Sequence, residues 1–461
     1  MKFKLLKLFK KSDGENENGE EQKTTETKHY LTGKEVRAIV KANSKEMKRL
    51  EKYKNRRAPE SEFLSEMKDP GNILEVEDLH SYFFTEQGVV KAVNGVSFSV
   101  PLNSTVGVVG ESGCGKSVTS MSVMRLLQGP TGQIVSGSIR FRSYDFKRDA
   151  SGKAIPVYER DENGEIVYDV KKDRQGNDVL DKKTGEPVKV PRVKLDEYGT
   201  CMYEKEEKVF DIAKMPVREM YRLRGRQLAM IFQEPMTSLN PVFTIGNQLD
   251  EVTLLHVPGA TKEMAKRRSI EMLNLVGIAM PERVYKSYPH ELSGGMRQRV
   301  MISMALAGEP RLIIADEPTT ALDVTIQAQI LELLNGLKTR INGSILLITH
   351  DLGIIAEMAD YVVVMYAGRI IEQGTAEEIF LNPLHPYTQG LQKSKPTMKS
   401  SSDQLFNIPG NVPNPINMPD YCYFKERCSQ CIEKCSGHYP EMVQVGPTHF
   451  VACHLYDRKE D

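Results

Sequence analysis

The hydrophobic and polar positions of this chain predict a fold of the α/β class. Apolar and polar residues alternate in LEVEDLHSYFF, in KAVNGVSFSV and over residues 136–143, which is typical of half-buried strands. VGVVG, LIIADEP and ILLITHD are instead continuously apolar, as parallel strands covered on both faces are. Residues 243–287 have the pattern of helices.

The N-terminal region, residues 1–70, departs from this pattern because it is polar and rich in Lys, Glu, Asn and Thr. Asp13 to Lys28 contain almost no apolar residue, so we expect an extension that is largely disordered. Within it, Glu35 to Lys54 could form a polar helix. The basic first residues could lie on an anionic membrane surface, but a solvated tail is the simpler interpretation.

A second departure, residues 145–214, is rich in turn signals. Ser151-Gly152, Asn163-Gly164, Gln175-Gly176 and Thr184-Gly185 separate short alternating runs. We interpret the region as an inserted β-meander of weak hairpins. The sequence does not specify the function of this region. We interpret it as a solvent-exposed insertion, with a docking surface as the alternative.

Composition narrows the class of protein further. Hydrophobic residues make up 40% of the 461 residues, which suffices for a buried core, and Lys plus Arg equals Asp plus Glu at 62 each. The resulting net charge of zero argues against a dedicated nucleic-acid binder. No run of 18 apolar residues occurs, and the first eleven residues lack the apolar core of a signal peptide. We therefore expect a cytosolic protein.

The strongest chemical signal is a glycine-rich loop between a predicted strand and a predicted helix. Gly110 to Ser117 read GESGCGKS, which matches the pattern of a phosphate-binding loop. The glycines let backbone N–H groups surround a phosphate, and the start of the helix adds partial positive charge. Lys116 can reach the β- and γ-phosphates, and Ser117 can bind Mg²⁺. The loop predicts a nucleoside triphosphate site.

Two acidic residues, Asp316 and Glu317, end the apolar run LIIADEP. A carboxylate at the end of such a strand can hold Mg²⁺, usually through water, so we assign this role to Asp316. Glu317 could then polarise the attacking water as a general base. The pair predicts hydrolysis of the bound nucleotide.

A third signal is the octapeptide LSGGMRQR, Leu292 to Arg299. Ser293, Gly294 and Gly295 would open a helix, and their hydroxyl and N–H groups would form an anion-binding end. With the preceding motifs, the octapeptide resembles the signature of ABC transporter nucleotide-binding domains. The resemblance implies a P-loop NTPase with a RecA-like core, an antiparallel β subdomain and a helical subdomain. A β-rich insertion and a Cys-rich C-terminal extension would be additions to it.

The resemblance also assigns roles to residues that would otherwise be interpreted as structural. In this family the signature faces the γ-phosphate held by a partner cassette, so two cassettes enclose two ATP molecules. Gln233 resembles the glutamine that senses Mg²⁺ and the membrane subunit, and His350 resembles the histidine that contacts the γ-phosphate. Ala321-Leu322-Asp323 resembles the loop at the dimer interface. Phe83 resembles the aromatic residue that stacks on adenine, with Tyr82 and Phe84 as alternatives.

The complete predicted site contains catalytic, metal and nucleotide residues. Glu317, His350 and Gln233 are the catalytic candidates, and Ser117, Gln233 and Asp316 are the Mg²⁺ candidates. The residues expected to contact ATP are Phe83, Gly110, Glu111, Ser112, Gly113, Cys114, Gly115, Lys116, Ser117, Val118, Gln233, Asp316, Ser293, Gly294, Gly295, Gln298 and Asp323.

Further sequence segments resemble those of the ATPases of oligopeptide and dipeptide importers, of the OppD and DppD type. These segments include QEPMTSLNPVFTIGNQ, NPLHPYTQGL, IPGNVP and HFVACHLY. The resemblance covers roughly residues 72–144 and 215–456. It implies two transmembrane permease subunits, a second ATPase of the OppF type, an extracytoplasmic substrate-binding protein and a position on the cytoplasmic face of the membrane. Nickel or another small solute is the alternative cargo.

Five of the seven cysteines lie between Cys422 and Cys453. In a reducing compartment, clustered cysteines more often bind metal than form disulfides. The resemblance implies that Cys422, Cys428, Cys435 and Cys453 hold a 4Fe–4S cluster, for which four thiolates are needed. Zinc and free buried thiols are the alternatives, and the extra Cys431 makes a Cys-x-x-Cys pair that would fit zinc.

Three domains follow: an extension over 1–70, a nucleotide-binding domain over 71–400 and a Cys-rich extension over 401–461. The domain would carry the insertion at 145–214 and a helical subdomain at 240–300. Two other classes of function compete. A soluble ABC ATPase acting on DNA or ribosomes is disfavoured because the chain has one set of motifs and lacks heptads in its insertion. A degenerate regulatory cassette is disfavoured because Glu317 and His350 are present.

Overall fold

The computed structural model describes residues 31–457 except 174, 182–183, 196–198, 200, 235–237, 321–322, 341–342, 395–406 and 417. The disorder predicted for Asp13 to Lys28 lies outside the described residues, as do the basic first residues. No helix in the described ranges is both long and apolar enough to cross a membrane.

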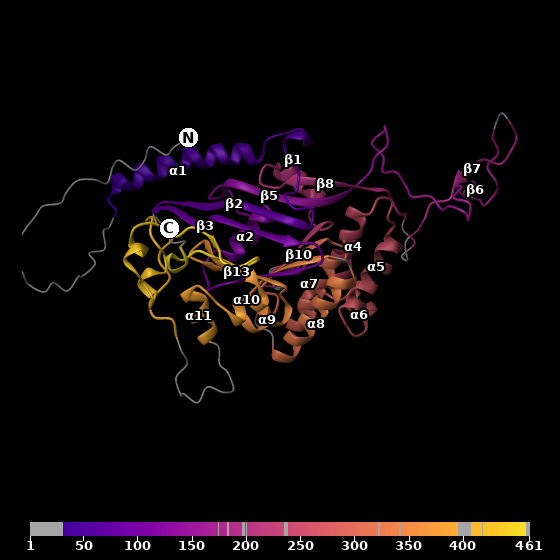
Figure 1. The fold of residues 1–461 in the computed structure, drawn as a ribbon. Helices are drawn as coiled ribbons and strands as arrows, with labels where there is room; N and C mark the ends of the chain where they lie inside the picture. Colours follow the sequence, from indigo (N-terminus) through magenta and orange to yellow (C-terminus); the bar gives the residue numbers. More distant parts are fainter. Residues whose placement is uncertain are drawn as a thin grey trace, which may run out of the picture.

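An eight-stranded sheet forms the centre of the fold (Figure 1). Its order is β14-β15-β13-β12-β4-β11-β10-β9, and the five strands from β12 to β9 are parallel. The predicted parallel strands are thereby confirmed. The bounds of the strands are β4 Thr105–Val109, β9 Leu228–Ile231, β10 Leu312–Asp316, β11 Ser344–Ile348, β12 Tyr361–Tyr366, β13 Arg369–Thr375, β14 Val443–Gln444 and β15 Phe450–Val451.

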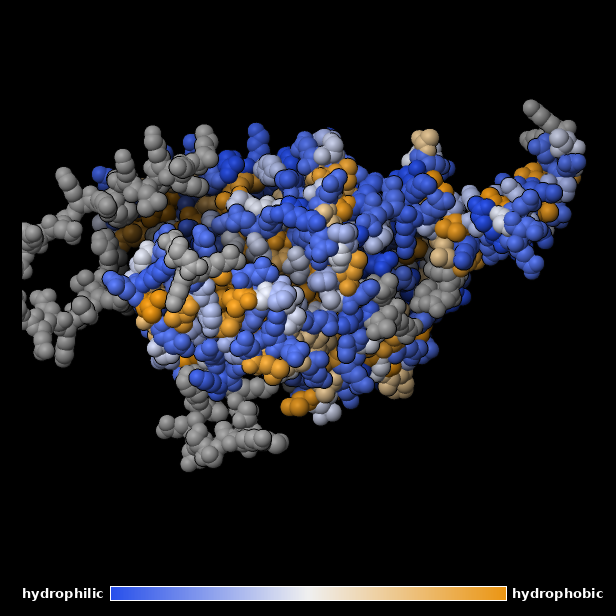
Figure 2. Space-filling model, viewed as in Figure 1, coloured by the Kyte–Doolittle hydropathy of each residue, from blue (hydrophilic) through white to orange (hydrophobic). Residues whose placement is uncertain are grey.

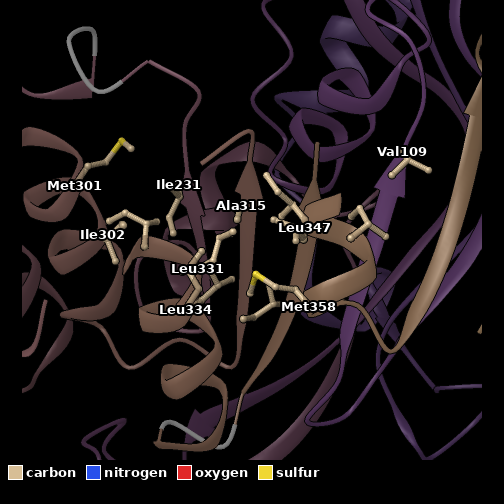
Figure 3. Packing of buried hydrophobic residues seen from close by; sticks show 14 of the residues in the cluster. Val109, Ile231, Met301, Ile302, Ala315, Leu331, Leu334, Leu347 and Met358 are labelled. Carbon is tan, nitrogen blue, oxygen red and sulfur yellow. The ribbon is translucent and has the colours of Figure 1, made fainter. Parts of the chain in front are cut away.

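The continuous apolar runs in these strands are explained by two cores, one on each face of the sheet. Along β10, Ile313 and Ala315 pack into one core, whereas Leu312 and Ile314 pack into the other. Figure 3 shows the first core, in which Ala315 and Leu347 lie among residues of the surrounding helices such as Leu331 and Met358. Because both faces are covered, every residue of β4, β10 and β11 is buried.

The second core is closed by a five-stranded antiparallel sheet of order β1-β8-β5-β2-β3. The alternating runs predicted as strands form β2 and β3, and one face of them is buried with residues such as Val76, Leu79 and Phe98. The prediction of these strands is confirmed. Their bounds are β1 Leu64–Ser65, β2 Asn72–Thr85, β3 Gly88–Pro101, β5 Gly132–Phe146 and β8 Lys205–Asp211.

Helices make up the region that was predicted to be helical. Thr244 and Thr261 begin α4 and α5, because each hydroxyl accepts a hydrogen bond from a backbone N–H in the first turn. These helices pack beside α7. The bounds of the helices between Lys116 and Met358 are α2 Lys116–Val123, α4 Ile245–His256, α5 Lys262–Leu275, α6 Pro281–Lys286, α7 Gly294–Leu306, α8 Val324–Arg340 and α9 Leu352–Met358.

Between β5 and β8 the chain forms an arm that projects from the body (Figure 1). It holds the two-stranded sheet of β6 (Tyr168–Val170) and β7 (Lys189–Pro191) and a series of single β-bridges. Its first three turns are each closed by an aspartate, since the side chains of Asp149, Asp161 and Asp173 accept from backbone N–H groups two residues later. Apolar residues gather on its surface between hydrophilic ones (Figure 2).

Part of the polar N-terminal region is folded. Residues Gly33–Lys54 form α1, which confirms the predicted helix, and Thr32 begins it with a capping box to Glu35. The helix lies along the antiparallel sheet, where the Asn43 amide donates to the carbonyl of Thr85. Leu50 is also buried, and Val36, Ile39 and Met47 are half-buried, so one face of the helix packs against the body of the protein.

The C-terminal region packs against the edge of the central sheet. β15 pairs with β13, and β14 pairs with β15. Glu372 of β13 is fully buried and accepts from the N–H groups of Leu384 and His385, and it contacts His449 at 2.9 Å. The region also contains α10 Ala376–Leu381 and α11 Pro386–Lys393. Short 3₁₀ helices lie at Glu60–Glu62, Val217–Arg222, Pro289–Glu291, Lys425–Arg427, Glu433–Ser436 and His454–Tyr456.

Candidate nucleotide-binding site

The glycine-rich loop connects β4 to α2, and its backbone requires glycine at two positions. Gly110 has a φ of 153°, and a Cβ there would lie 2.2 Å from the carbonyl oxygen of Met365. Gly115 has a φ of 103°, and a Cβ there would lie 2.3 Å from the carbonyl oxygen of Ala92. The loop therefore packs backbone to backbone against its neighbours, and those of its N–H groups that are not used within the chain would line an anion site.

Lys116 begins α2 and is buried. Its ammonium group donates to the carbonyl oxygens of Gly110 at 2.7 Å and Glu111 at 3.1 Å. The lysine is thus held over the loop on which a triphosphate would lie. Cys114 is fully buried, and burial raises the pKa of its thiol, so this cysteine fills space in the loop.

Ser117 and Asp316 come together at the predicted Mg²⁺ site. The Ser117 hydroxyl donates to Asp316 Oδ1 at 3.1 Å, and Asp316 is 3% exposed. Burial raises the pKa of Asp316, while the hydrogen bond from Ser117 opposes this rise. A hydroxyl and a carboxylate are oxygen ligands of the kind that Mg²⁺ prefers, so these two residues fit the ion that ATP would bring.

Glu317 lies at the centre of a hydrogen-bonded group. Gln233 Nε2 and Thr320 Oγ1 each donate to Glu317 Oε2 at 2.9 Å, and His350 Nδ1 lies 3.2 Å from Oε1. Burial alone would raise the pKa of Glu317, but the hydrogen bonds from His350 and Thr320 lower it overall. Glu317 is therefore ionised at neutral pH, as a general base must be.

The sheet order explains why these residues meet. β4, β11, β10 and β9 are neighbours, and all four are parallel, so their carboxyl ends lie at one edge. Lys116 and Ser117 follow β4, His350 follows β11, Glu317 follows β10 and Gln233 follows β9. One edge of the sheet thus carries both the glycine-rich loop and the hydrogen-bonded group around Glu317.

The signature residues lie on a different element. Ser293 caps α7 by accepting from the N–H of Met296, and the space beside Gly294 is open. Among the described residues, no hydrogen bond joins Ser293, Gly294 or Gly295 to the phosphate loop. Ala321 and Leu322 lie outside the described residues, and Asp323 accepts from the N–H of Ile326 at 2.9 Å.

Two other predicted contacts of ATP have partners within the chain. Gln298 is 2% exposed, and its amide donates to the carbonyl oxygen of Pro318 at 2.5 Å. Phe83 is half-buried, and its ring lies beside Gly132. Tyr82, an alternative to Phe83, donates to Asn94 Oδ1, and burial raises its pKa to about 12. The roles of Gln298 and Phe83 towards ATP remain predictions.

Three residues at this site were missed by sequence reasoning: Thr320, which donates to Glu317, and Arg427 and Tyr387. Arg427 holds the carboxylate of Glu111 with two hydrogen bonds, and the Tyr387 hydroxyl accepts from the backbone N–H of Glu111. Arg427 is 316 positions from Glu111 along the chain, and no local pattern links them. Nothing in the sequence indicated that Arg427 contacts Glu111, and Tyr387 was noted only as part of the segment NPLHPYTQGL.

The predicted cluster cysteines lie in one region of the C-terminal extension. The backbone N–H of Cys422 donates to the carbonyl oxygen of Cys435 at 3.0 Å, and burial raises the pKa of the Cys422 thiol to about 12. However, in the part of the chain that the structure describes, no three or more His, Cys, Asp or Glu side chains are arranged as a metal site. The arrangement of the thiols therefore does not support the predicted 4Fe–4S cluster or the zinc alternative.

Comparison with known proteins defines first the class and then the family. The sequence profile described as "ABC transporter" matches residues 93–194 and 197–320, so the class is that of ABC ATPases. The profile described as "Oligopeptide/dipeptide transporter, C-terminal region" matches residues 371–435. A solved dimeric ABC transporter cassette, MJ0796, is 19% identical, with a TM-score of 0.46, over 66% of this chain and 98% of that chain.

Curated relatives are similar over most of their length. The oligopeptide transport ATP-binding protein AppD of Bacillus subtilis is 41% identical over 84% of this chain and 98% of that protein. The oligopeptide transport ATP-binding protein OppD of the same organism is 43% identical over 82% of this chain and 87% of that protein. The chain belongs to the family of ATP-binding proteins of oligopeptide and dipeptide ABC transporters.

Proposed function

We propose that this chain binds and hydrolyses ATP to energise the import of oligopeptides or dipeptides. The observation that carries the proposal is the Glu317 group: an ionised carboxylate, bonded to Gln233 and Thr320 and close to His350, lies at the same sheet edge as Lys116 and Ser117. The names of the relatives support the peptide cargo, since AppD and OppD are oligopeptide transport proteins. Nickel or another small solute remains the second candidate.

The proposed reaction needs little covalent participation by the protein. The amides of the loop and Lys116 would hold the β- and γ-phosphates, and Ser117 and Asp316 would place Mg²⁺ beside them. Glu317 would orient and polarise the attacking water, with His350 and Gln233 completing its surroundings. Mg²⁺ would supply charge neutralisation during transfer of the γ-phosphoryl group.

We propose that the site is completed by a second cassette, of the OppF type. Ser293 caps α7 with its anion-binding end open, and no hydrogen bond of the described residues connects it to the loop of its own chain. A signature helix from a partner would supply the missing donors. ATP would then favour the closed pair to the extent that it binds that state more tightly.

Two permease subunits and an extracytoplasmic substrate-binding protein would complete the importer, with this chain on the cytoplasmic face of the membrane. Exposed apolar residues in the loop before α4 and on α4 support a docking surface for a permease, since Val242 is 74% exposed and Leu255 is 70% exposed. The domain divisions 1–70, 71–400 and 401–461 remain part of this proposal. Assays of iron and acid-labile sulfide on anaerobically purified protein test the cluster that was predicted from the sequence on Cys422, Cys428, Cys435 and Cys453.

The experiment that tests the function uses the chain assembled with its permeases and second ATPase in proteoliposomes. Addition of ATP inside and of binding protein with peptide outside should drive peptide uptake, and Lys116→Ala should abolish it. Uptake of nickel instead of peptide would select the second candidate. ATPase activity stimulated by DNA or ribosomes, but not by peptide-loaded binding protein, would contradict a transport function.

A further inference from the structure

Glu111, the second residue of the phosphate loop, has all three of its polar groups engaged. Its backbone N–H donates to the Tyr387 hydroxyl at 2.8 Å, its carbonyl oxygen accepts from Lys116 at 3.1 Å, and its carboxylate accepts from Arg427. Two of these three partners come from the C-terminal region. The conformation of the loop is therefore fixed partly by residues far from it in the sequence.

Arg427 makes the stronger of the two remote contacts. Its Nη1 donates to Glu111 Oε2 at 2.8 Å and its Nη2 donates to Oε1 at 2.9 Å, which is the bidentate geometry of a strong charge-assisted pair. The side chain of Arg427 is only 6% exposed. Its Nε donates to the carbonyl oxygen of Pro409 at 2.9 Å, and Nη1 also donates to the Tyr366 hydroxyl. These contacts hold the guanidinium in one orientation.

Tyr387 is held equally firmly. It is fully buried, and its ring centroid lies 4.8 Å from that of Tyr366 and 5.5 Å from that of Phe424. Phe424 and Arg427 belong to one short segment, because the Arg427 N–H donates to the Phe424 carbonyl. The aromatic rings thus join α11, β12 and the Cys-rich segment into a single support behind the loop.

We propose that Arg427 and Tyr387 are positioning residues that hold the phosphate loop in its ATP-binding form, so that the C-terminal region sets the affinity for ATP. This inference rests on the proposed function, since it concerns the same site. Two physical effects combine. Tyr387 fixes the Glu111 backbone, and with it the carbonyl that Lys116 contacts. Arg427 neutralises the Glu111 carboxylate, which would otherwise place a negative charge beside the triphosphate.

The test is Arg427→Gln in the full chain, assembled with its partner subunits. The Kd of a fluorescent ATP analogue, and the KM of ATP hydrolysis, should each rise by about tenfold or more, since a charge-assisted pair is lost and a carboxylate is left without a counter-charge. The kcat at saturating ATP should change much less, because Arg427 does not contact the Glu317 group. Arg427→Lys should restore part of the affinity, since it keeps the charge but not the bidentate geometry.

Two further variants separate positioning from a general effect on folding. Tyr387→Phe removes only the hydroxyl and should also raise the Kd; this variant remains informative if Arg427→Gln does not fold. In a Glu111→Gln background, Arg427→Gln should add little to the Kd, because the carboxylate that it would expose is gone. Arg192→Gln is the matched control, since Arg192 makes a similar pair with Asp169 on the arm and should leave the Kd unchanged.

Equal Kd and KM values in the wild type, Arg427→Gln and Tyr387→Phe would overturn the inference, even if the melting temperature fell. A Kd increase in Arg427→Gln that persists undiminished in the Glu111→Gln background would overturn the electrostatic part. Failure of the wild type to bind ATP at all would instead refute the proposed function. The two failures are therefore distinguishable.

Discussion

Replacement of Glu317 by glutamine tests the proposed chemistry most directly. The substitution keeps the volume of the side chain and removes its charge and its ability to accept a proton. In the structure, Glu317 Oε2 accepts hydrogen bonds from Gln233 and Thr320, and Oε1 lies beside His350. If the side-chain nitrogen of the new glutamine takes the place of Oε2, it faces two hydrogen-bond donors and cannot accept from them. Because the site is at the surface, water can compensate, and the loss of stability should be about 1 kcal/mol.

The expected kinetic effect is much larger than this structural one. Loss of a general base typically lowers the rate about 10²- to 10⁴-fold, which corresponds to about 3–5 kcal/mol of barrier. The Kd for ATP should stay within about twofold of the wild-type value, since Lys116 and the loop amides are unchanged. The assays are steady-state phosphate release and binding of a fluorescent ATP analogue, both with the assembled transporter.

Glu377→Gln is a control for the loss of a carboxylate as such. Glu377 lies in the first turn of α10, and the residues of the catalytic group do not contact it. Its replacement should leave the kcat unchanged. A Glu317→Gln variant that hydrolyses ATP at near the wild-type rate, with normal ATP affinity, would refute the assignment of Glu317 as the base.

Three further predictions concern the loop, the arm and the pH dependence of stability. Gly110→Ala should abolish binding of the ATP analogue and lower the free energy of unfolding by at least about 1 kcal/mol, because a Cβ would lie 2.2 Å from the Met365 carbonyl oxygen; normal binding would contradict the loop geometry. Joining Phe146 to Lys205 by a short turn should leave ATP hydrolysis unchanged, since these residues are already paired and the arm beyond them contributes nothing to the catalytic group; a large loss of hydrolysis would contradict this. Burial alone would raise the pKa of Asp145, but the hydrogen bond and charge of Arg222 lower it below the ordinary 3.8. The Asp145 carboxylate therefore contributes to stability above about pH 4, and this contribution is lost as the pH falls below that value. In urea titrations, the free energy of unfolding of Asp145→Asn should fall less steeply with decreasing pH below about 4 than that of the wild type; an equally steep fall would contradict this.

The strands and the chemistry at their ends could be predicted because both are local properties of the sequence. A run such as LIIADEP specifies a buried strand and also the two carboxylates that follow it. The structure adds that Asp316 meets Ser117 and that Glu317 meets Gln233 and His350. That convergence follows from the parallel order of the strands, so it could be expected once the strands were recognised.

The support behind the loop could not be predicted in the same way. Glu111 and Arg427 are each ordinary charged residues in their own surroundings, and their pairing depends on how the C-terminal segment folds back. Thr320 was likewise missed, since a hydroxyl three residues after Glu317 has many possible structural roles. For the cysteines, the sequence supplied four ligands, but the described residues do not bring three of them into a metal site.

The two sets of contacts divide the nucleotide site into parts with different functions. The catalytic group around Glu317 consists of strand-end residues, and changes there should alter turnover. The phosphate loop is also held from behind by the C-terminal region, and changes there should alter affinity. Tyr387 and Arg427 both lie within residues 371–435, which match the profile of the transporter C-terminal region and lie beyond the residues that match the ABC transporter profile. A segment beyond the cassette core can thus adjust ATP binding without touching the residues that hydrolyse it.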